Sequence, residues 1–407
     1  ESSIPCTPLG CYLLIKKIEP NLNGKKAVIV GRSNLNGKPM TQLLLKENCT
    51  VTITHSRTKD LKAECLEADI IVAAVGIPEL VKGDRIKKDA IIIDGLVVSK
   101  FSRELFEDMA RGGVTAANCT CSVWENFSQT MANISQWNQW FRDNSDIIIK
   151  ITSVDDIRKA KSDGKVGIIL GWQNTSAIDT DIRNLELFYD LGVRVVQLTY
   201  NTQNLVGSGC WETHDGGLTD FGRHAIDEMN RLGMLVDLSH VGPLTSDQAI
   251  KYSSSPVAYT HCCPMLLEHP RNKTDDQLRT IANHGGFVGF ASYTPFLPKG
   301  PETTIEDCIE GIEYLINLIG EDNIGLGTDW IQDQDMAFFD YISADKGLGR
   351  LTTKGFQHFK LPAMPKGLET LGDYQNFIPA MERAGWSETR IRGILGDNWL
   401  KFLGEVW

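Results

Sequence analysis

Two short apolar runs that each end in or near a histidine constrain this chain more than any other feature of its sequence. LVDLSHV spans residues 235–241 and PVAYTH spans residues 256–261, with a helical stretch between them. A strand, a helix and a second strand in this order form a βαβ unit with parallel strands. Because the carboxyl ends of parallel strands lie at one edge, we expect His240 and His261 to lie side by side. Either histidine alone is more often a framework residue, but two imidazoles at adjacent strand ends form half of a catalytic zinc site.

Eight strand candidates of this kind follow one another at the spacing of a barrel. Their apolar residues come in continuous runs, which is typical of parallel strands that are buried on both faces. Eight strand–helix units over about 300 residues predict an α/β fold, a (β/α)8 barrel of the TIM type. The candidates lie at 90–98, 113–120, 166–173, 194–200, 235–241, 256–261, 285–292 and 323–330. Residues 331–368 form a long excursion, for which we expect a lid or an oligomer contact.

A second α/β pattern precedes the barrel. KKAVIVG, TVTITH and DIIVAAVG alternate with helical stretches between residues 24 and 76, which predicts a parallel, doubly wound sheet. The glycine-rich turn at 31–39 stands between a strand and a helix, whose N-terminal N–H groups favour a phosphate. We therefore predict two domains. Residues 1–88 form a truncated Rossmann-like segment of the NAD(P)-binding type, and residues 89–407 form the barrel.

Charge and cysteine usage limit the classes of partner. Residues 1–89 hold 14 Lys/Arg and 10 Asp/Glu, whereas the rest of the chain holds 27 and 42, and this acidic balance argues against nucleic acid. The sequence shows neither a signal segment nor an apolar run near the roughly 20 residues of a membrane helix. The ten cysteines have no paired CxxC spacing, which predicts free thiols and a cytoplasmic location. The expected partner is a small-molecule substrate, and the question of whether the chain forms a homo-oligomer stays open.

The central stretch resembles the renal (membrane) dipeptidase family of zinc peptidases. The resemblance is carried by GLTDFGR (217–223), NRLGMLVDLSH (230–240), PVAYTH (256–261) and RNKTDD (271–276). It implies a (β/α)8 barrel with two bridged zinc ions that cleaves dipeptides. At the matching positions it implies that His240 and His261 bind metal. It also implies that Arg271 binds the substrate carboxylate through its planar fork and that Asp329 is the acid/base aspartate.

Four positions depart from the pattern of that family. Leu96 and Val98 stand where a histidine and an aspartate of the first barrel strand would bind zinc. Gln173 replaces the glutamate that bridges the two ions, and a neutral amide is a much poorer ligand, so we place Gln173 among the substrate-binding residues. Tyr200 replaces a substrate-binding histidine and is expected to donate a hydrogen bond to a developing oxyanion. We therefore expect one weakly held divalent metal ion, zinc or another, or none.

Residues 1–93 resemble the nucleotide-binding half of methylenetetrahydrofolate dehydrogenase/cyclohydrolase. PCTPLG (5–10), GRSNLNGKP (31–39), VTITHSRT (51–58) and ADIIVAAVG (68–76) carry the resemblance, although Asn36 stands where valine is usual. It implies an NADP site, whose phosphates would be lined by Gly31, Arg32, Ser33, Gly37, His55, Ser56 and Arg57. The half of that family that supplies the catalytic lysine has no counterpart in this sequence, so we do not expect an intact dehydrogenase.

Both resemblances include the strand DAIIIDG (89–95), and we assign it to the barrel because a barrel needs all eight strands to close. The predicted function is that of a hydrolase-type enzyme acting on a small amide or an amino-acid-like carboxylate. Two alternatives stay open. One is a non-catalytic ligand-binding or scaffold protein. The other is a fused one-carbon enzyme, whose barrel handles a folate-linked or methylated amine substrate.

Overall fold

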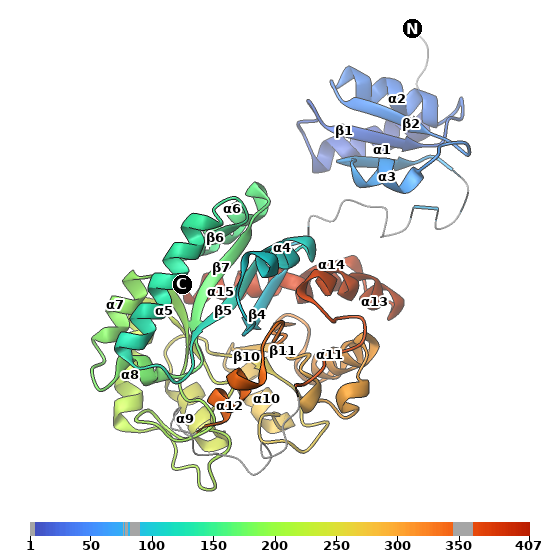
Figure 1. Cartoon of the computed structure of the whole chain (residues 1–407). Coiled ribbons are helices and arrows are strands. Elements are labelled where there is room, and N and C mark those ends of the chain that lie inside the picture. Colours follow the sequence, from blue (N-terminus) through green and yellow to red (C-terminus); the bar gives the residue numbers. More distant parts are fainter. Residues whose placement is uncertain (1–4, 76, 78–79, 82–89, 345–360) are drawn as a thin grey trace. The chain divides into compact units, whose positions relative to one another are not determined.

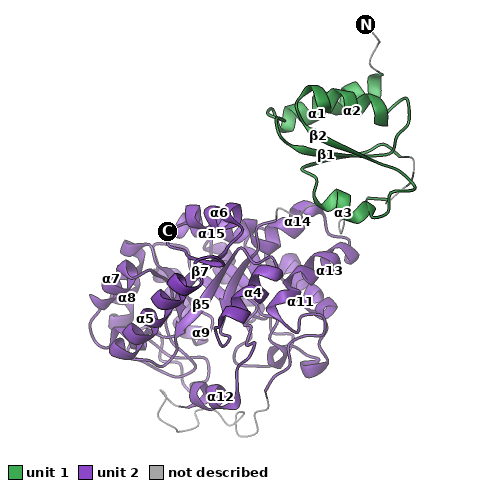
Figure 2. Cartoon of the chain, turned by 45° about the horizontal axis from the view of Figure 1, so that its top comes forward, with its two compact units in different colours: residues 1–89 green, residues 90–407 purple. Residues whose placement is uncertain are grey.

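The chain divides into two compact units, residues 1–89 and residues 90–407 (Figure 2). The computed structural model describes residues 5–75, 77, 80–81, 90–344 and 361–407. Residues 345–360, which belong to the predicted excursion, therefore lie outside the described residues.

The first unit contains a small parallel sheet with the strand order β2-β1-β3. Its strands are β1 (Lys26–Val30), β2 (Thr50–Thr54) and β3 (Ile70–Ala73), and its helices are α1 (Cys6–Ile18), α2 (Gly37–Lys46) and α3 (Leu61–Leu66). The alternation of strand and helix that the sequence predicted is confirmed. The sequence pattern did not indicate α1, whose Tyr12 hydroxyl donates a 2.5 Å hydrogen bond to Glu47 after the end of α2.

The second unit is a closed barrel of eight parallel strands with helices around it (Figure 1). The ring runs β5-β4-β12-β11-β10-β9-β8-β7, and β7 pairs with β5 to close it. All eight strands that the sequence predicted are present. They are β4 (Ile93–Val97), β5 (Ala116–Ser122), β7 (Val166–Trp172), β8 (Val193–Gln197), β9 (Leu235–Asp237), β10 (Ala258–Cys262), β11 (Phe287–Phe290) and β12 (Ile324–Leu326).

The strand that both resemblances share belongs to the barrel. In β4, Ile93 pairs with Ala116 of β5, and Asp94 pairs with Leu326 of β12, so the expectation for this strand is confirmed. The sequence pattern did not indicate a ninth strand, β6 (Ile148–Lys150), which pairs with the start of β7 outside the ring.

The helices follow the sequence signals for capping. The Thr219 side chain caps the start of α8 (Asp220–Leu232), and Gly233 ends this helix with φ = 74°. The other helices are α4 (Arg103–Arg111), α5 (Phe127–Asp143), α6 (Val154–Asp163), α7 (Asn184–Asp190), α9 (Pro243–Tyr252), α10 (Asp275–Asn283), α11 (Ile305–Ile319), α12 (Met336–Ser343), α13 (Phe377–Arg383), α14 (Glu388–Arg392) and α15 (Asn398–Val406). None of the described helices is both long and apolar enough to cross a membrane. All ten cysteines are free thiols, as the sequence predicted.

Trp399 of α15 fills the amino-terminal end of the barrel. Its indole N–H donates a 2.8 Å hydrogen bond to the Leu326 carbonyl. The centroid of its ring lies 4.0 Å from the centroid of the Phe287 ring. Gly325 makes room for it, because a Cβ there would lie 2.5 Å from the indole ring. With this end packed, the chemistry-bearing side chains gather at the opposite, carboxyl end of the strands.

Candidate active site

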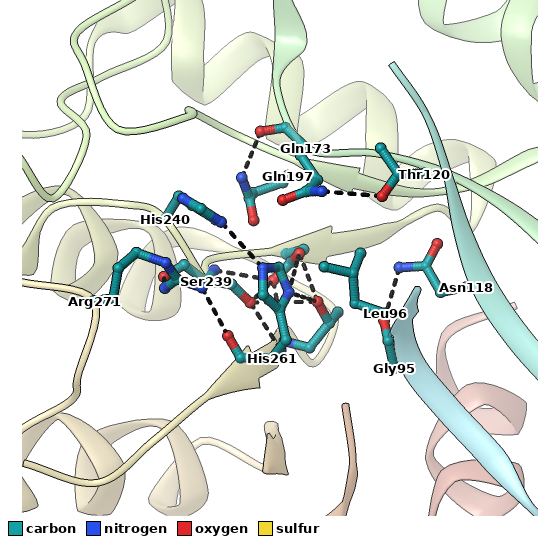
Figure 3. A network of polar contacts seen from close by, with 12 residues as sticks. Gly95, Leu96, Asn118, Thr120, Gln173, Gln197, Ser239, His240, His261 and Arg271 are labelled. Atoms are coloured by element: carbon teal, nitrogen blue, oxygen red, sulfur yellow. Dashed lines mark hydrogen bonds and ion pairs between the residues drawn. The ribbon is translucent and has the colours of Figure 1, made fainter. Parts of the chain in front are cut away.

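His240 and His261 face each other at the carboxyl ends of β9 and β10 (Figure 3). Their Nε2 atoms lie 3.1 Å apart, and both side chains are buried. The sequence prediction that these two histidines lie side by side is therefore confirmed.

Hydrogen bonds behind the two rings determine where each imidazole carries its proton. The Nδ1 of His240 lies 2.8 Å from the Asn201 side-chain oxygen, which accepts its proton. The Nδ1 of His261 lies 2.8 Å from the Thr260 hydroxyl, whose own proton goes to Asp237 at 2.7 Å. Because the Thr260 oxygen must then accept, both histidines are protonated on Nδ1. Each directs the lone pair of Nε2 toward the other.

Two lone pairs at this distance repel each other unless a positive centre lies between them. Two imidazole nitrogens that bind one zinc ion at 2.0–2.1 Å with a tetrahedral angle are roughly 3.3–3.4 Å apart. The 3.1 Å separation is close to this value, so the pair fits one metal ion. Among the described residues no group of three His, Cys, Asp or Glu side chains is placed to hold a metal. Further ligands would therefore be water or substrate.

The surrounding charges favour neutral imidazoles but weaken cation binding. Burial, together with the charges of Arg271 and Lys273, holds the pKa values of His240 and His261 well below the usual range. Metal binding requires this neutral form. Lys273 is itself fully buried, and burial lowers its pKa to about 8. Two basic groups this close make the site less attractive to a divalent cation than the histidine geometry alone would.

The positions that depart from the family pattern give the pair no anionic partner. Leu96 and Val98 are buried, and Leu96 points toward the histidines (Figure 3). The Gln173 amide donates a 3.0 Å hydrogen bond to the Thr120 hydroxyl. The wall that faces the histidines is therefore apolar or neutral at all three positions.

A cavity of about 80 Å³ opens beside the histidine pair, and we call it the reaction pocket. Its lining includes five of the six barrel residues that the sequence assigned to the site, namely Gln173, Tyr200, His240, Arg271 and Asp329. The sixth, His261, does not line the pocket but contacts His240, which does. The sequence did not indicate the aromatic walls, which come from connecting segments and from α12. They are Trp211, Tyr293, Phe296, Phe338 and Phe339.

Asp329 and Tyr200 present polar groups to the reaction pocket. Asp329 follows β12 with φ = 60°, a left-handed conformation that aspartate tolerates better than most residues. Burial raises its pKa to about 6, against the lowering effect of Arg271. Tyr200 stacks on His240 with ring centroids 4.2 Å apart, and burial raises the pKa of its phenol, so the hydroxyl keeps its proton as a donor.

Arg271 connects the two segments that carry the histidines through hydrogen bonds to their backbone carbonyls. One terminal nitrogen donates to the Ser239 carbonyl, and the other donates to the His261 carbonyl at 3.1 Å. The Nε–H has no partner among the described residues. The guanidinium therefore combines a structural role with N–H groups that remain free for a ligand.

Sequence reasoning missed the residues that orient the histidines. Asn201, Asp237 and Thr260 are buried and hold the two Nδ1 protons in place, directly or through one another. Asp237 lies within the motif VDLSH, and its place close to His240 was the only local sign that it helps to orient a histidine. Asn201 contacts a histidine 39 residues away, and no local pattern announces such a contact.

The glycine turn of the first unit is tightly closed between β1 and α2. Gly31 has φ = 111°, and a Cβ on Gly37 would lie 2.2 Å from the Gly31 carbonyl oxygen. The Ser33 hydroxyl accepts a 3.1 Å hydrogen bond from the Asn36 N–H at the start of α2. The other predicted phosphate-lining side chains follow β1 and β2 and are exposed or half-buried. They are Arg32, His55, Ser56 and Arg57.

Comparison with protein families yields two matches. The membrane dipeptidase (peptidase family M19) model matches residues 100–344. The NAD(P)-binding domain of tetrahydrofolate dehydrogenase/cyclohydrolase matches residues 5–134. The two matches overlap at 100–134, a segment that the structure places in the barrel as α4, β5 and part of α5.

Individual relatives agree with this division. A solved amidohydrolase from Pseudomonas aeruginosa is 50% identical, covers 78% of this chain and 97% of its own, and has a TM-score of 0.76. The uncharacterized dipeptidase C965.12 of Schizosaccharomyces pombe is 32% identical over 65% of this chain and 58% of its own length. The bifunctional protein FolD of Pelagibacter ubique is 78% identical over 27% of this chain and 39% of its own length. The chain thus spans less than two thirds of the length of either curated relative.

The barrel match covers more than half of the sequence and coincides with the unit that holds the histidine pair. The chain therefore belongs to the membrane dipeptidase family, peptidase family M19, and its N-terminal segment is similar to the NAD(P)-binding domain of FolD proteins.

Proposed function

We propose that the barrel is a hydrolase-type enzyme that acts on a small amide or an amino-acid-like carboxylate, with one weakly held divalent metal ion. The observation that carries the proposal is the pair of Nε2 lone pairs that face each other at 3.1 Å, with both Nδ1 protons held by acceptors. His240 and His261 would hold the ion, which would supply a Lewis acid and a more acidic bound water.

The residues of the reaction pocket divide the remaining tasks. Arg271 binds the substrate carboxylate through the N–H groups that the strand carbonyls leave free. Asp329, whose pKa is raised to about 6, accepts a proton from water and returns it to the leaving nitrogen. The Tyr200 hydroxyl donates a hydrogen bond to the oxygen that becomes negative. The aromatic walls exclude water from these groups.

Metal analysis combined with a substrate panel tests this proposal. Purified protein is analysed for bound metal, loaded with zinc or manganese, and assayed on dipeptides and N-acyl amino acids. We expect at most one ion per chain, and activity on a subset of these amides that Asp329→Asn removes. Protein that binds no metal and cleaves no member of the panel would favour the ligand-binding or scaffold alternative.

A second candidate function belongs to the first unit, where we propose a nicotinamide nucleotide site at the turn that begins with Gly31. The close approach of Gly37 to the Gly31 carbonyl supports it, since only a turn without side chains lets a phosphate reach the backbone. Titration with NADPH, followed by its fluorescence, tests the site. Saturable binding would also support the folate-linked alternative for the whole chain, whereas no binding would leave the unit without this role. The location of the protein in the cytoplasm remains a prediction.

A further inference from the structure

A second cavity, larger than the reaction pocket, lies in the barrel unit at the segments that follow β7 and β8. Its volume is about 570 Å³, within the range of small-molecule sites. It shares no lining residue with the reaction pocket, and we call it the side cavity.

Trp124 lies between the two cavities. It lines the side cavity, while its indole N–H donates a 3.2 Å hydrogen bond to the carbonyl of Ile342, which lines the reaction pocket. Its ring also meets the Tyr200 ring edge-on, with centroids 5.2 Å apart. A ligand in the side cavity would therefore rest against the wall of the reaction pocket without entering it.

Asn174 presents an unsatisfied donor in the side cavity. Its side chain is only 2% exposed, and its oxygen accepts a 2.8 Å hydrogen bond from the Asn204 amide. The Asn204 oxygen accepts from the Val206 and Gly207 N–H groups, which fixes the orientation of both amides. The Asn174 NH2 group is thus left without a partner within the described part of the chain. This NH2 group is therefore available to donate to a ligand in the side cavity.

The charge of the side cavity is negative. Asp179 and Glu212 line it, and no lysine, arginine or histidine is among the lining residues. One Glu212 oxygen accepts a 2.6 Å hydrogen bond from the Gln203 N–H, which positions the carboxylate. The aromatic rings of Trp124 and Phe221 add the faces that attract an organic cation.

We propose that the side cavity is a second ligand site for a small organic ammonium compound that also carries a neutral oxygen acceptor, such as an amide. The carboxylates and rings bind the ammonium group, and Asn174 donates to the acceptor. A ligand with a free carboxylate is repelled. This proposal depends neither on a metal ion nor on the reaction proposed above.

Calorimetry with three matched probes tests the site. L-leucinamide has the ammonium and the neutral carbonyl, N-acetyl-L-leucinamide lacks the cation, and L-leucine adds a carboxylate. The measurements use full-length Asp329→Asn protein at pH 6.5, where the probe amines are protonated. This background removes Asp329, the one carboxylate among the described residues that line the reaction pocket, so a probe bound there meets no negative charge from them. We expect the Kd of L-leucinamide to be at least roughly tenfold lower than that of either other probe. Loss of one hydrogen bond to a charged group weakens binding by about this factor. Equal binding of the three probes, or no binding of L-leucinamide, would overturn the proposal.

Variants in the same background locate the binding. Glu212→Gln and Asp179→Asn each remove one charge with little change in shape, and asparagine tolerates the 49° φ of Asp179. We expect each variant to weaken L-leucinamide binding roughly tenfold. Glu107→Gln, on the exposed side of α4, is the matched control and should leave binding unchanged. If both side-cavity variants fold like the parent and bind the probe equally well, the proposal is wrong.

Discussion

At the scale of single residues, the decisive feature of the site is the proton position on two histidines. An ordinary pair of buried histidines can share one hydrogen bond between them, but here Asn201 and Thr260 take both Nδ1 protons. These hydrogen bonds therefore leave two acceptor nitrogens facing each other, and a cation between them relieves their repulsion.

Replacing His240 with alanine should remove whatever metal the purified protein carries. Its Nε2 is one of the two nitrogens that face each other at 3.1 Å, and a single histidine holds a divalent ion poorly. Gln173→Ala is the matched control and should keep most of the metal, because the Gln173 amide donates to Thr120 and is a weak ligand. Elemental analysis of both variants decides the point. Equal metal content in wild type and His240→Ala would mean that the histidines are structural.

Asp329 should make the metal-free fold less stable at alkaline pH. Its folded pKa of about 6 lies above the unfolded value, so its stabilising effect is present below about pH 4 and is lost as pH rises through 6. A shift of roughly 2 units corresponds to about 3 kcal/mol. In urea unfolding with a chelator, Asp329→Asn should be about 2–3 kcal/mol more stable than wild type at pH 8 and nearly equal at pH 4.

The control for this change is Asp333→Asn, since Asp333 is exposed and has a similar φ of 63°. It should alter stability little at either pH. If Asp329→Asn lost stability at pH 8, the carboxylate would be held by an interaction that outweighs its burial.

At the scale of elements, the positions where the sequence departs from the expected donors follow particular strands. Three of the lost or changed donors lie at the ends of β4 and β7, whereas the ends of β9 and β10 keep theirs. The β4 and β7 ends that carry these three positions are separated in the ring from β9 and β10, and Figure 3 shows Leu96 and Gln173 near the two histidines.

Restoring the donors on β4 and β7 should change both the metal content and the substrate range. The triple variant Leu96→His, Val98→Asp and Gln173→Glu supplies two anionic groups and one imidazole next to the pair. We expect it to bind more zinc than wild type and to hydrolyse dipeptides that wild type cleaves slowly or not at all. Zinc stoichiometry and dipeptide assays measure this. Brisk dipeptide cleavage and two zinc ions in the unmodified protein would contradict our interpretation of these positions.

The turn between β1 and α2 should tolerate no side chain at Gly37. A methyl group there would lie 2.2 Å from the Gly31 carbonyl, so Gly37→Ala should cost about 1–3 kcal/mol in the first unit and abolish NADPH binding. Gly10→Ala in α1 is the matched control, because a Cβ there meets nothing within 4 Å and alanine favours the helix. Calorimetric unfolding and NADPH titration compare the two variants. A Gly37→Ala protein that binds NADPH normally would show that the turn is not used.

The sequence predicted the barrel well because buried parallel strands leave continuous apolar runs, such as VGIILGW in β7. It did not indicate β6, whose three residues IIK are too few for a periodic signal. The histidine pair was predicted because both residues stand at strand ends. The walls of the reaction pocket were not, because Trp211, Phe296 and Phe338 are brought together by tertiary packing of segments far apart in the chain.

At the scale of the whole molecule, the chain joins two units that each complete a fold from their own residues. The first unit keeps three strands of its sheet, and the strand that would extend it in a dehydrogenase-like domain is used by the barrel instead. Strand β4 lies within the match to the FolD-type domain, which continues to residue 134, although the structure assigns all residues from Ala90 onward to the barrel unit.

Residues 90–407 should therefore fold and bind metal when produced without the first 89 residues. The ring of strands closes through the pairing of β4 with β5 and β12, and Trp399 packs its amino-terminal end, all within this span. In calorimetry we expect the isolated barrel to unfold at the same temperature as the barrel does in the full chain. Only the full chain should show a second transition whose temperature NADPH raises. Metal content per barrel should be the same in both. An isolated barrel that aggregates, or loses its metal while the full chain keeps it, would show that the first unit is needed to complete the second.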